Sequence, residues 1–421
     1  MKLIQTSIFS AIASAIGILS GLIVTKIIAI FIGPSGIAFI GQFQNFVSLV
    51  LNISGNAFST AITKYTAEYH SDSLKKYKLW SATIAMAIPI SLLCSILVFN
   101  FSSELSMYLL HEDKYHYIFR IFSLTIPFFL INTLLMSILN GHKEIRKYIF
   151  LNIFSSICSL CVIPILTIYL AFEGVLLAHI LGQVFITIIV FIFIKKESWL
   201  RITNFTVHFN MGEVKKIFGF AIITFTAVSS SLLMMLIIRS YLVDNFSVES
   251  AGYWQSIMGL SQALLGLITT SLATYFLPTL SLLTEQKDIS NELRKGYFLM
   301  MPVVIIISLS VYILREPIIL ILYTEQFMPM KDLFAWQFIG NIIKVAAWLL
   351  GYLMVAKAMV KITVSTEVIF ALMFILLTKI FTDEFGLVGV TYAYALNAFL
   401  HLITMIFFYH YKMKRMVFIN G

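Results

Sequence analysis

FAWQFIGNIIKVAAWLLGYLMVAK, residues 334–357, is a long apolar stretch with one charged residue, Lys344, between its ends. A helix needs about 20 mostly apolar residues to cross a bilayer, so this stretch predicts a transmembrane helix. Charged residues make up only 12% of the 421 residues, against roughly 25% in soluble domains. So few charges cannot cover a soluble surface, and the composition therefore excludes a soluble enzyme.

Similar apolar stretches recur on both sides of residues 334–357, separated by charged or Gly/Pro-containing breaks. We expect twelve transmembrane helices, at residues 7–32, 37–62, 79–101, 117–140, 147–171, 173–195, 214–243, 250–277, 297–315, 331–357, 361–381 and 385–411. The first stretch continues without a break to Ile32, so we interpret it as an uncleaved helix rather than a signal peptide. The expected fold class is an all-α membrane protein.

Basic residues gather in alternate breaks. Of the 29 Lys and Arg residues, 21 lie in one set of alternating segments. They are Lys2, Lys64, Lys75, Lys76, Lys78, Lys143, Arg146, Lys147, Lys195, Lys196, Arg201, Lys215, Lys216, Lys287, Arg294, Lys295, Lys357, Lys361, Lys412, Lys414 and Arg415. Cytoplasmic loops are enriched in Lys and Arg, so this pattern predicts that both termini are cytoplasmic. The net charge of +9 then reflects topology, and we expect no nucleic-acid partner.

The chain divides near its midpoint into two halves that resemble each other weakly. Gly36 and Gly252 each open a helix, and Glu68 and Glu285 each follow one, at an offset of about 216 residues. Chance likeness between apolar segments is the alternative explanation. We predict an N-terminal six-helix bundle at 1–195, a cytoplasmic linker at 196–213 and a C-terminal six-helix bundle at 214–421.

Four charged residues lie inside the expected helices: Lys26, Arg239, Lys344 and Glu367. Each costs roughly 2.5–3.5 kcal/mol at a helix centre, which makes each a candidate for function. Lys344 lies too deep to reach either interface. Lys26 and Arg239 lie nearer the outer helix ends, where snorkelling to the headgroups is the alternative. Glu367 is a candidate for ion coupling, or it complements the positive N-terminus of its helix.

Polar side chains also form stripes at helical spacing in several of these helices. The second helix carries Gln42, Asn45, Asn52, Asn56, Thr60, Thr63 and Lys64, the eighth Gln255, Gln262 and Thr269, and the tenth Gln337, Asn341, Lys344, Trp348 and Tyr352. Hydrogen bonds between helices explain any one of them, whereas several stripes with buried cations indicate a wet, positively charged cavity for an anionic, sugar-bearing ligand. Our candidate binding residues are Lys26, Lys64, Arg239, Lys344, Asn45, Asn52, Gln262, Asn341 and Trp348.

The three cysteines, Cys94, Cys158 and Cys161, all fall inside expected helices. The CSLC spacing lacks a second ligand pair nearby, so we interpret them as apolar filler and expect no metal and no cofactor.

Four stretches resemble the Wzx-type flippases of the polysaccharide transporter family. They are GPSGIAFIGQFQNF at 33–46, AITKYTAEYHSD at 61–72, YFLPTLSLLTEQKDIS at 275–290 and YTEQFMPMKDLFAWQFIGNIIKVAAWLLGYLMVAKA at 323–358. The resemblance runs over essentially the whole chain. It implies the fold of the multidrug and toxic compound exporters, with two six-helix bundles in a V and alternating access across a bacterial inner membrane.

The resemblance also implies a substrate, an undecaprenyl-pyrophosphate-linked oligosaccharide that is carried to the periplasmic leaflet. O-antigen units and lipid III both remain open. Lys26, Lys64, Arg239 and Lys344 stand where the family's basic cavity residues are expected. We also expect contacts with membrane lipids. The resemblance further implies a polysaccharide polymerase and a chain-length regulator as candidate partners. We expect the protein to be a monomer.

Two other classes of protein compete with this interpretation. A drug or cation antiporter of the same fold needs acidic residues for cationic substrates, and residues 7–32 contain no Asp or Glu. A membrane polymerase or glycosyltransferase needs a long extramembrane loop with catalytic residues, and the longest expected breaks are 63–78, 196–213 and 278–296. Neither fits as well as a transporter that is not an enzyme.

Overall fold

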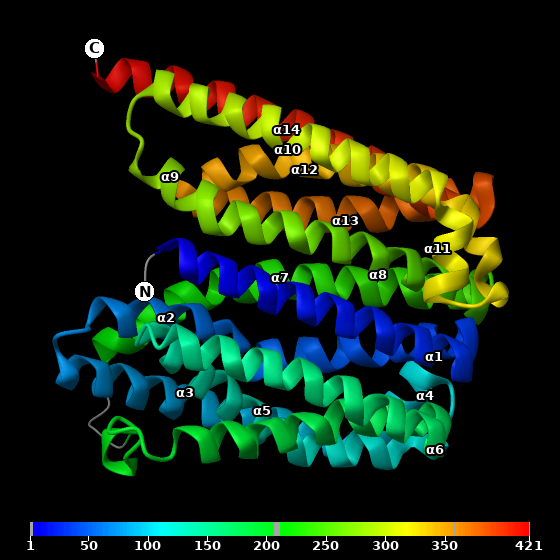
Figure 1. Cartoon of the computed structure of the whole chain (residues 1–421), viewed down its shortest axis with the longest axis horizontal. Coiled ribbons are helices and arrows are strands. Elements are labelled where there is room, and N and C mark those ends of the chain that lie inside the picture. Colours follow the sequence, from blue (N-terminus) through cyan, green and yellow to red (C-terminus); the bar gives the residue numbers. More distant parts are fainter. Residues whose placement is uncertain (1–2, 206–210, 358, 421) are drawn as a thin grey trace. The chain divides into compact units, whose positions relative to one another are not determined.

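The computed structural model describes residues 3–205, 211–357 and 359–420, and no strand occurs among them (Figure 1). The long helices are α1 (Leu3–Ser54), α3 (Ser73–Asn100), α5 (His116–Gly141), α6 (Ile145–Ile194), α7 (Met211–Asn245), α8 (Val248–Ser271), α10 (Gln286–Ile313), α12 (Phe334–Ala356), α13 (Val360–Phe385) and α14 (Gly389–Asn420). The short ones are η1 (Asn56–Phe58), α2 (Ser59–Glu68), α4 (Ser102–Leu110), η2 (Asp113–Tyr115), η3 (Ile202–Phe205), η4 (Leu272–Phe276), α9 (Leu277–Leu282), α11 (Arg315–Leu322), η5 (Glu325–Leu333) and η6 (Gly386–Val388).

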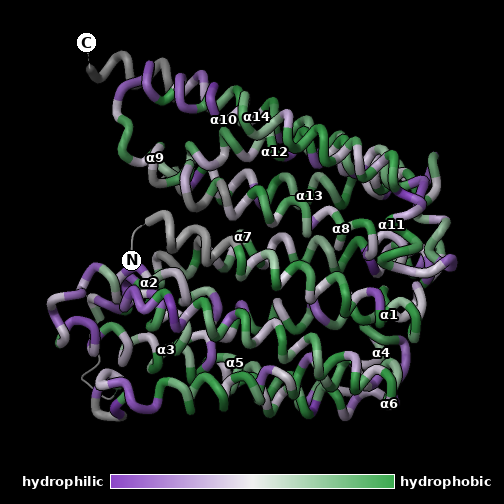
Figure 2. Tube along the Cα trace, viewed as in Figure 1, coloured by the Kyte–Doolittle hydropathy of each residue, from purple (hydrophilic) through white to green (hydrophobic). Residues whose placement is uncertain are grey.

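Eight helical segments within the described residues are long and apolar enough to cross a membrane, so the chain is a multi-pass membrane protein. Three of these segments are double-length: those in α1, in α6 and over Lys361–Tyr411. All twelve expected helices fall on helical stretches, which is consistent with the expected count. Figure 2 shows hydrophobic residues mainly along the helices and hydrophilic ones mainly at turns and helix ends. Phe298 is 83% exposed, as a lipid-facing side chain should be.

The double-length segments are divided at residues with left-handed backbone. Gly33 has φ 72° inside α1, and Gly386 has φ 62° between α13 and α14. Only glycine adopts this conformation at little cost, so these positions fix where the chain turns. Ala171, with φ 46°, divides α6 between the fifth and sixth expected helices.

Several helices extend beyond their apolar runs. α3 begins at Ser73 rather than 79 because the Asp72 side chain caps it by accepting a hydrogen bond from the backbone N–H of Lys75 (3.0 Å). α10 begins at Gln286, within residues 278–296, which the sequence predicts to be a break between two helices. Hydropathy marks only the apolar part of a helix, whereas backbone hydrogen bonding continues through charged turns. The short helices α4 and α11, which follow α3 and α10, were not predicted.

Contacts between residues group the chain into two compact units. Unit 1 comprises Met1–Ile32 and Phe39–Leu233, and unit 2 comprises Gly33–Ala38 and Met234–Gly421. The division of the chain into bundles at 1–195 and 214–421 stays a prediction, and residues 206–210 of the expected linker lie outside the described residues.

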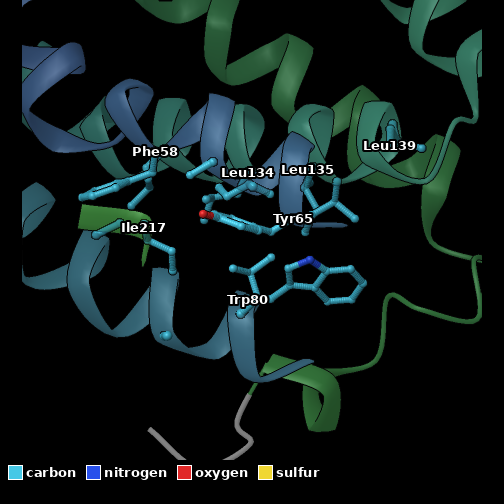
Figure 3. Close-up of a cluster of buried hydrophobic side chains, with 14 of the residues drawn as sticks. Phe58, Tyr65, Trp80, Leu134, Leu135, Leu139 and Ile217 are labelled. Atoms are coloured by element: carbon cyan, nitrogen blue, oxygen red, sulfur yellow. The ribbon is translucent and has the colours of Figure 1, made fainter. Parts of the chain in front are cut away.

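The core of unit 1 is an apolar cluster between α2, α3 and α5, closed by the start of α7 (Figure 3). Trp80 of α3 is 1% exposed and donates a hydrogen bond from Nε1 to Thr66 Oγ1 of α2 (2.9 Å). Its ring also packs on Trp199 and Phe205, which follow α6. These contacts hold the segment after α6 against the end of unit 1 that carries the basic residues of 63–78.

His142 lies in this aromatic cluster, just after α5. Its ring stacks on Trp199 (centroids 5.7 Å apart) and contacts Trp80 (5.6 Å). Burial, together with nearby Lys76, lowers the pKa of His142 below its ordinary value. The folded protein therefore binds the proton less readily than the unfolded chain. This contribution to stability is complete above the unfolded pKa of about 6.5 and is lost as the pH falls through and below it.

We therefore expect acid to destabilise unit 1 partly through His142. The melting temperature of the purified protein should fall between about pH 8 and 5, and it should fall less in His142→Gln, which cannot titrate. Thermal melts of both proteins over this range provide the measurement. Equal pH dependence in the two proteins would contradict this prediction.

In unit 2, α12 packs against α8, α9, α10 and α14. Small residues allow close approach: a Cβ on Gly340 of α12 would lie 2.5 Å from the Tyr394 ring of α14. One apolar side of α12, including Phe334, Phe338, Val345 and Leu349, is almost fully buried. α12 is therefore a central element of unit 2, and of its polar stripe Gln337 and Asn341 are buried while Lys344, Trp348 and Tyr352 are half-buried.

Candidate functional site

A cavity of about 700 Å³ lies in unit 1 between α2, α5 and the two arms of α6, which are the parts of that helix before and after Ala171. We call it the polar cavity. From α2 it is lined by Ser59, Thr60, Thr63 and Lys64, and from α5 by Asn132, Thr133, Met136, Ser137 and Asn140. From α6 it is lined by Tyr148, Asn152, Ser155, Gln183 and Ile186. Most of these are hydroxyl or amide side chains, which hydrogen-bond sugars well.

Lys64 is the one charged residue among the described residues that line the polar cavity. It is exposed, and its Nζ lies 4.7 Å from the centre of the Tyr65 ring. The lining includes no carboxylate among the residues described. The potential in the cavity is therefore positive, which favours an anionic group over a cationic one.

The wall of the polar cavity is held by contacts between α2 and α5. Gly141 permits the close approach, since a Cβ there would lie 2.9 Å from the backbone oxygen of Thr63. Thr63 Oγ1 donates to the backbone oxygen of Ser137 (3.3 Å), and Thr133 Oγ1 donates to Asn56 Oδ1 (2.7 Å). Asn132 Oδ1 has no hydrogen-bond partner among the described residues.

Lys344 lies on α12 in unit 2, among aromatic and titratable groups. Its Nζ is 5.4 Å from the Trp348 ring and 5.3 Å from the Tyr394 ring of α14. Its charge also acts on Glu367 of α13 and on His401 of α14. Within the described residues, no carboxylate oxygen lies within 4.0 Å of its ammonium group. The half-buried cation thus faces three helices of unit 2, and cation–π contacts hold it in place.

Two amides of the α12 stripe are engaged in helix packing. Asn341 Oδ1 accepts hydrogen bonds from Ser261 Oγ of α8 (2.6 Å) and from Tyr394 OH (2.9 Å). Gln337 Nε2 donates to the same Ser261 (3.1 Å). Both amides are 0% exposed. This hydrogen-bond network joins α8, α12 and α14 one helical turn from Lys344, and it therefore helps to fix the position of that lysine.

Arg239 is 1% exposed on α7, within unit 2. Its Nη2 donates a hydrogen bond to Gln255 Oε1 of α8, and its guanidinium carbon lies 5.8 Å from the centre of the Trp254 ring. The side chain therefore points into unit 2, and it does not snorkel along a lipid-facing surface.

The other predicted residues have varied surroundings. Asn52 is buried and donates to Ser229 Oγ of α7 (3.1 Å). Lys26 and Asn45 are half-buried in unit 1, Trp348 is half-buried, and Gln262 and Glu367 are exposed in unit 2. Of the nine binding candidates, only Lys64 lines the polar cavity, and Asn341 and Trp348 lie near Lys344. The binding roles of these nine residues and the ion-coupling role of Glu367 stay predictions.

The sequence interpretation missed most of the polar cavity. Thr133, Ser137 and Asn140 in the fourth expected helix and Asn152 and Ser155 in the fifth are not among the residues that the sequence analysis selects, although each set recurs at helical spacing. That periodicity was the available signal.

It also missed a buried network at the junction of α2 and α7. Tyr69 OH donates to Glu213 (3.2 Å), and Lys216 Nζ contacts both groups. These two hydrogen-bond partners raise the pKa of Lys216.

A family model described as "polysaccharide biosynthesis protein" matches residues 3–284. The chain belongs to this family. The chain is similar to the lipid III flippase of Escherichia coli (strain K12), with 28% identity over 376 residues that cover 87% of the chain and 88% of the relative. The match confirms the resemblance seen in the sequence.

The fold of the chain is shared with solved transporters. An inward-facing multidrug resistance MATE family transporter of the MOP superfamily matches with a TM-score of 0.85 and 10% identity over 96% of each chain. The lipid II flippase MurJ, in an inward closed conformation, matches with a TM-score of 0.74 and 18% identity over 96% of this chain and 87% of MurJ. At such identities the likeness shows the fold, and it confirms the expected fold class.

No group of three or more His, Cys, Asp or Glu side chains that is suited to a metal ion occurs in the described part of the chain. Its three cysteines are free thiols, and Cys161 is exposed.

Proposed function

We propose that the chain is a flippase that moves an undecaprenyl-pyrophosphate-linked oligosaccharide from the cytoplasmic to the periplasmic leaflet of a bacterial inner membrane by alternating access. The polar cavity carries this proposal. A membrane protein has no structural need for a chamber of about 700 Å³ lined by hydroxyl and amide groups, because unfilled polar surface is costly inside a bilayer. The headgroup of a lipid-linked sugar needs such a surface.

The relatives support this class of substrate. The similar Escherichia coli protein is named a lipid III flippase, and its similarity extends over most of both chains. Relatives of this kind are transporters, so we propose that the chain carries out no covalent chemistry. Lipid III and an O-antigen unit remain the two candidate cargoes, and a polymerase and a chain-length regulator remain candidate partners of a monomeric transporter.

The charges inside the two units support an anionic cargo over a cationic drug. The polar cavity has one lysine and no acidic residue among its described lining, and unit 2 holds Lys344 and the buried Arg239. We propose Lys26, Lys64, Arg239 and Lys344 as contacts for the pyrophosphate or for acidic sugars. Glu367, near Lys344, is the candidate for ion coupling. Both termini are proposed to be cytoplasmic, because that side then carries the basic loops.

Complementation tests the proposed function. The chain is expressed in two strains, one that lacks its lipid III flippase and one that lacks its O-antigen flippase, and the surface polysaccharide is measured. We expect restoration in at least one strain. Failure in both strains, with the protein present in the inner membrane, together with export of cationic dyes, would show that the chain is a drug exporter.

A further inference from the structure

The chemistry of the polar cavity specifies its ligand more narrowly than the proposed function does. Its four amides, Asn132, Asn140, Asn152 and Gln183, come from α5 and from both arms of α6. Amides both donate and accept hydrogen bonds, which matches the hydroxyl and acetamido groups of sugars. Lys64 is the one cation in the described lining, and a single ammonium group balances one anionic group better than the several charges of a pyrophosphate.

We infer that the polar cavity of unit 1 is a subsite for a sugar unit that carries a single anionic group, with Lys64 binding that group and the amides of α5 and α6 binding its hydroxyl or acetamido groups. This inference rests on the proposed function and deepens it. The anionic group is a carboxylate or a phosphate ester on the sugar, since a lysine ammonium binds either as a point charge.

The size of the polar cavity agrees with this ligand. Its volume of about 700 Å³ lies within the roughly 300–1,000 Å³ typical of small-molecule sites. Met136 and Ile186 are the two wholly apolar residues of its described lining. The many hydroxyl and amide groups beside them suit a sugar better than a polyprenyl chain, so we place the lipid tail outside this cavity.

The rigidity of the wall explains how one sugar can be distinguished from another. Thr63 and Thr133 are held by hydrogen bonds between helices, and Ser137 Oγ donates to the backbone oxygen of Thr133 (2.7 Å). Asn152 Nδ2 donates a hydrogen bond to the backbone oxygen of Tyr148 (2.9 Å), and this bond fixes the orientation of the Asn152 amide. Groups that are fixed in this way select ligands by the pattern of their hydrogen bonds.

Binding of soluble probes to the full-length protein in nanodiscs tests the inference. The probes are the hyaluronan disaccharide, which carries one carboxylate, N-acetylglucosamine 1-phosphate, neutral chitobiose and inorganic pyrophosphate. Isothermal titration calorimetry reports binding of each. The variants are Lys64→Gln, Gln183→Glu and Asn132→Leu, and Lys78→Gln is the control because Lys78 is a basic residue of α3 outside the cavity lining.

We expect wild-type protein and Lys78→Gln to bind the two anionic sugars at least about tenfold more tightly than chitobiose, because a hydrogen bond to a charged group is stronger than a neutral one. Lys64→Gln should remove this preference without loss of chitobiose binding. Gln183→Glu should reverse it, and Asn132→Leu should weaken all three sugars. The relative response of the carboxylate and the phosphate ester identifies which anion Lys64 binds.

Three outcomes would overturn the inference: binding of pyrophosphate with no sugar signal, equal effects of Lys64→Gln and Lys78→Gln, or no binding of any probe. Complementation distinguishes these results from a failure of the proposed function. A chain that restores surface polysaccharide but binds no sugar in the polar cavity is a flippase without this subsite. A chain that restores none, yet binds the sugars as described, retains the subsite and refutes the flippase proposal.

Discussion

Lys344→Ala is expected to abolish complementation of a flippase-deficient strain while the protein still accumulates in the membrane. The ammonium group of Lys344 is half-buried among α12, α13 and α14, where cation–π contacts with Trp348 and Tyr394 fix it. A charge-assisted hydrogen bond contributes about 1.5–3 kcal/mol, so its loss should weaken anion binding by a factor on the order of 10 to 100. The measurement is surface polysaccharide normalised to membrane-inserted protein.

Stability is not expected to account for this loss. Lys344 forms no ion pair within 4.0 Å in the described chain, and its removal relieves the cost of desolvating a half-buried charge, which offsets the lost contacts with the aromatic rings. Lys344→Arg, which keeps the charge, should retain part of the activity. Lys379→Ala is the matched control, since Lys379 lies 5.9 Å from the Tyr241 ring in the same unit. Wild-type polysaccharide in Lys344→Ala would remove Lys344 from the mechanism.

The second large effect is expected at Arg239. The double variant Arg239→Met, Gln255→Leu should fold as well as the wild type and should fail to transport. Replacement of a buried charged residue and its partner by apolar side chains of similar size is often neutral or stabilising. The single variant Arg239→Met should be less stable, because it leaves the half-buried amide of Gln255 without this donor.

The melting temperature and complementation together separate fold from function at this position. Arg120→Met is the control: Arg120 is exposed on α5, and its guanidinium lies 5.5 Å from the Phe99 ring, so it makes a similar aromatic contact away from the proposed binding residues. Normal transport by the double variant would show that Arg239 serves only the packing of α7 on α8. Loss of folded double variant would show that the buried cation is required for the fold.

The membrane fold was predictable because hydropathy is a local property. A run of about 20 apolar residues specifies a helix in a bilayer whatever surrounds it. The sequence predicts the breaks at Gly33 and near residue 171, because glycine and short polar interruptions mark them locally. It does not predict that helices extend to Ser73 and Gln286, because charged turns carry no hydropathy signal.

The candidate site was predictable only in part. The depth of Lys344 and the stripe with Asn341 followed from one helix, and the structure places that stripe inside unit 2. Asn52 and Asn341 were selected as binding residues, whereas the structure shows their side chains in contacts between helices. Periodicity identifies the polar face of a helix, but it does not say whether that face meets another helix or a cavity.

The sequence by itself determined that this chain crosses a membrane many times, that basic residues mark alternate loops, and which family it belongs to. Only the tertiary structure decided that α2, α5 and the two arms of α6 converge on one polar cavity, and that Arg239 turns inward. The physical reason is that insertion depends on the composition of each segment, whereas a cavity depends on which faces of separate segments meet. That pairing is set by side-chain packing and hydrogen bonds between helices.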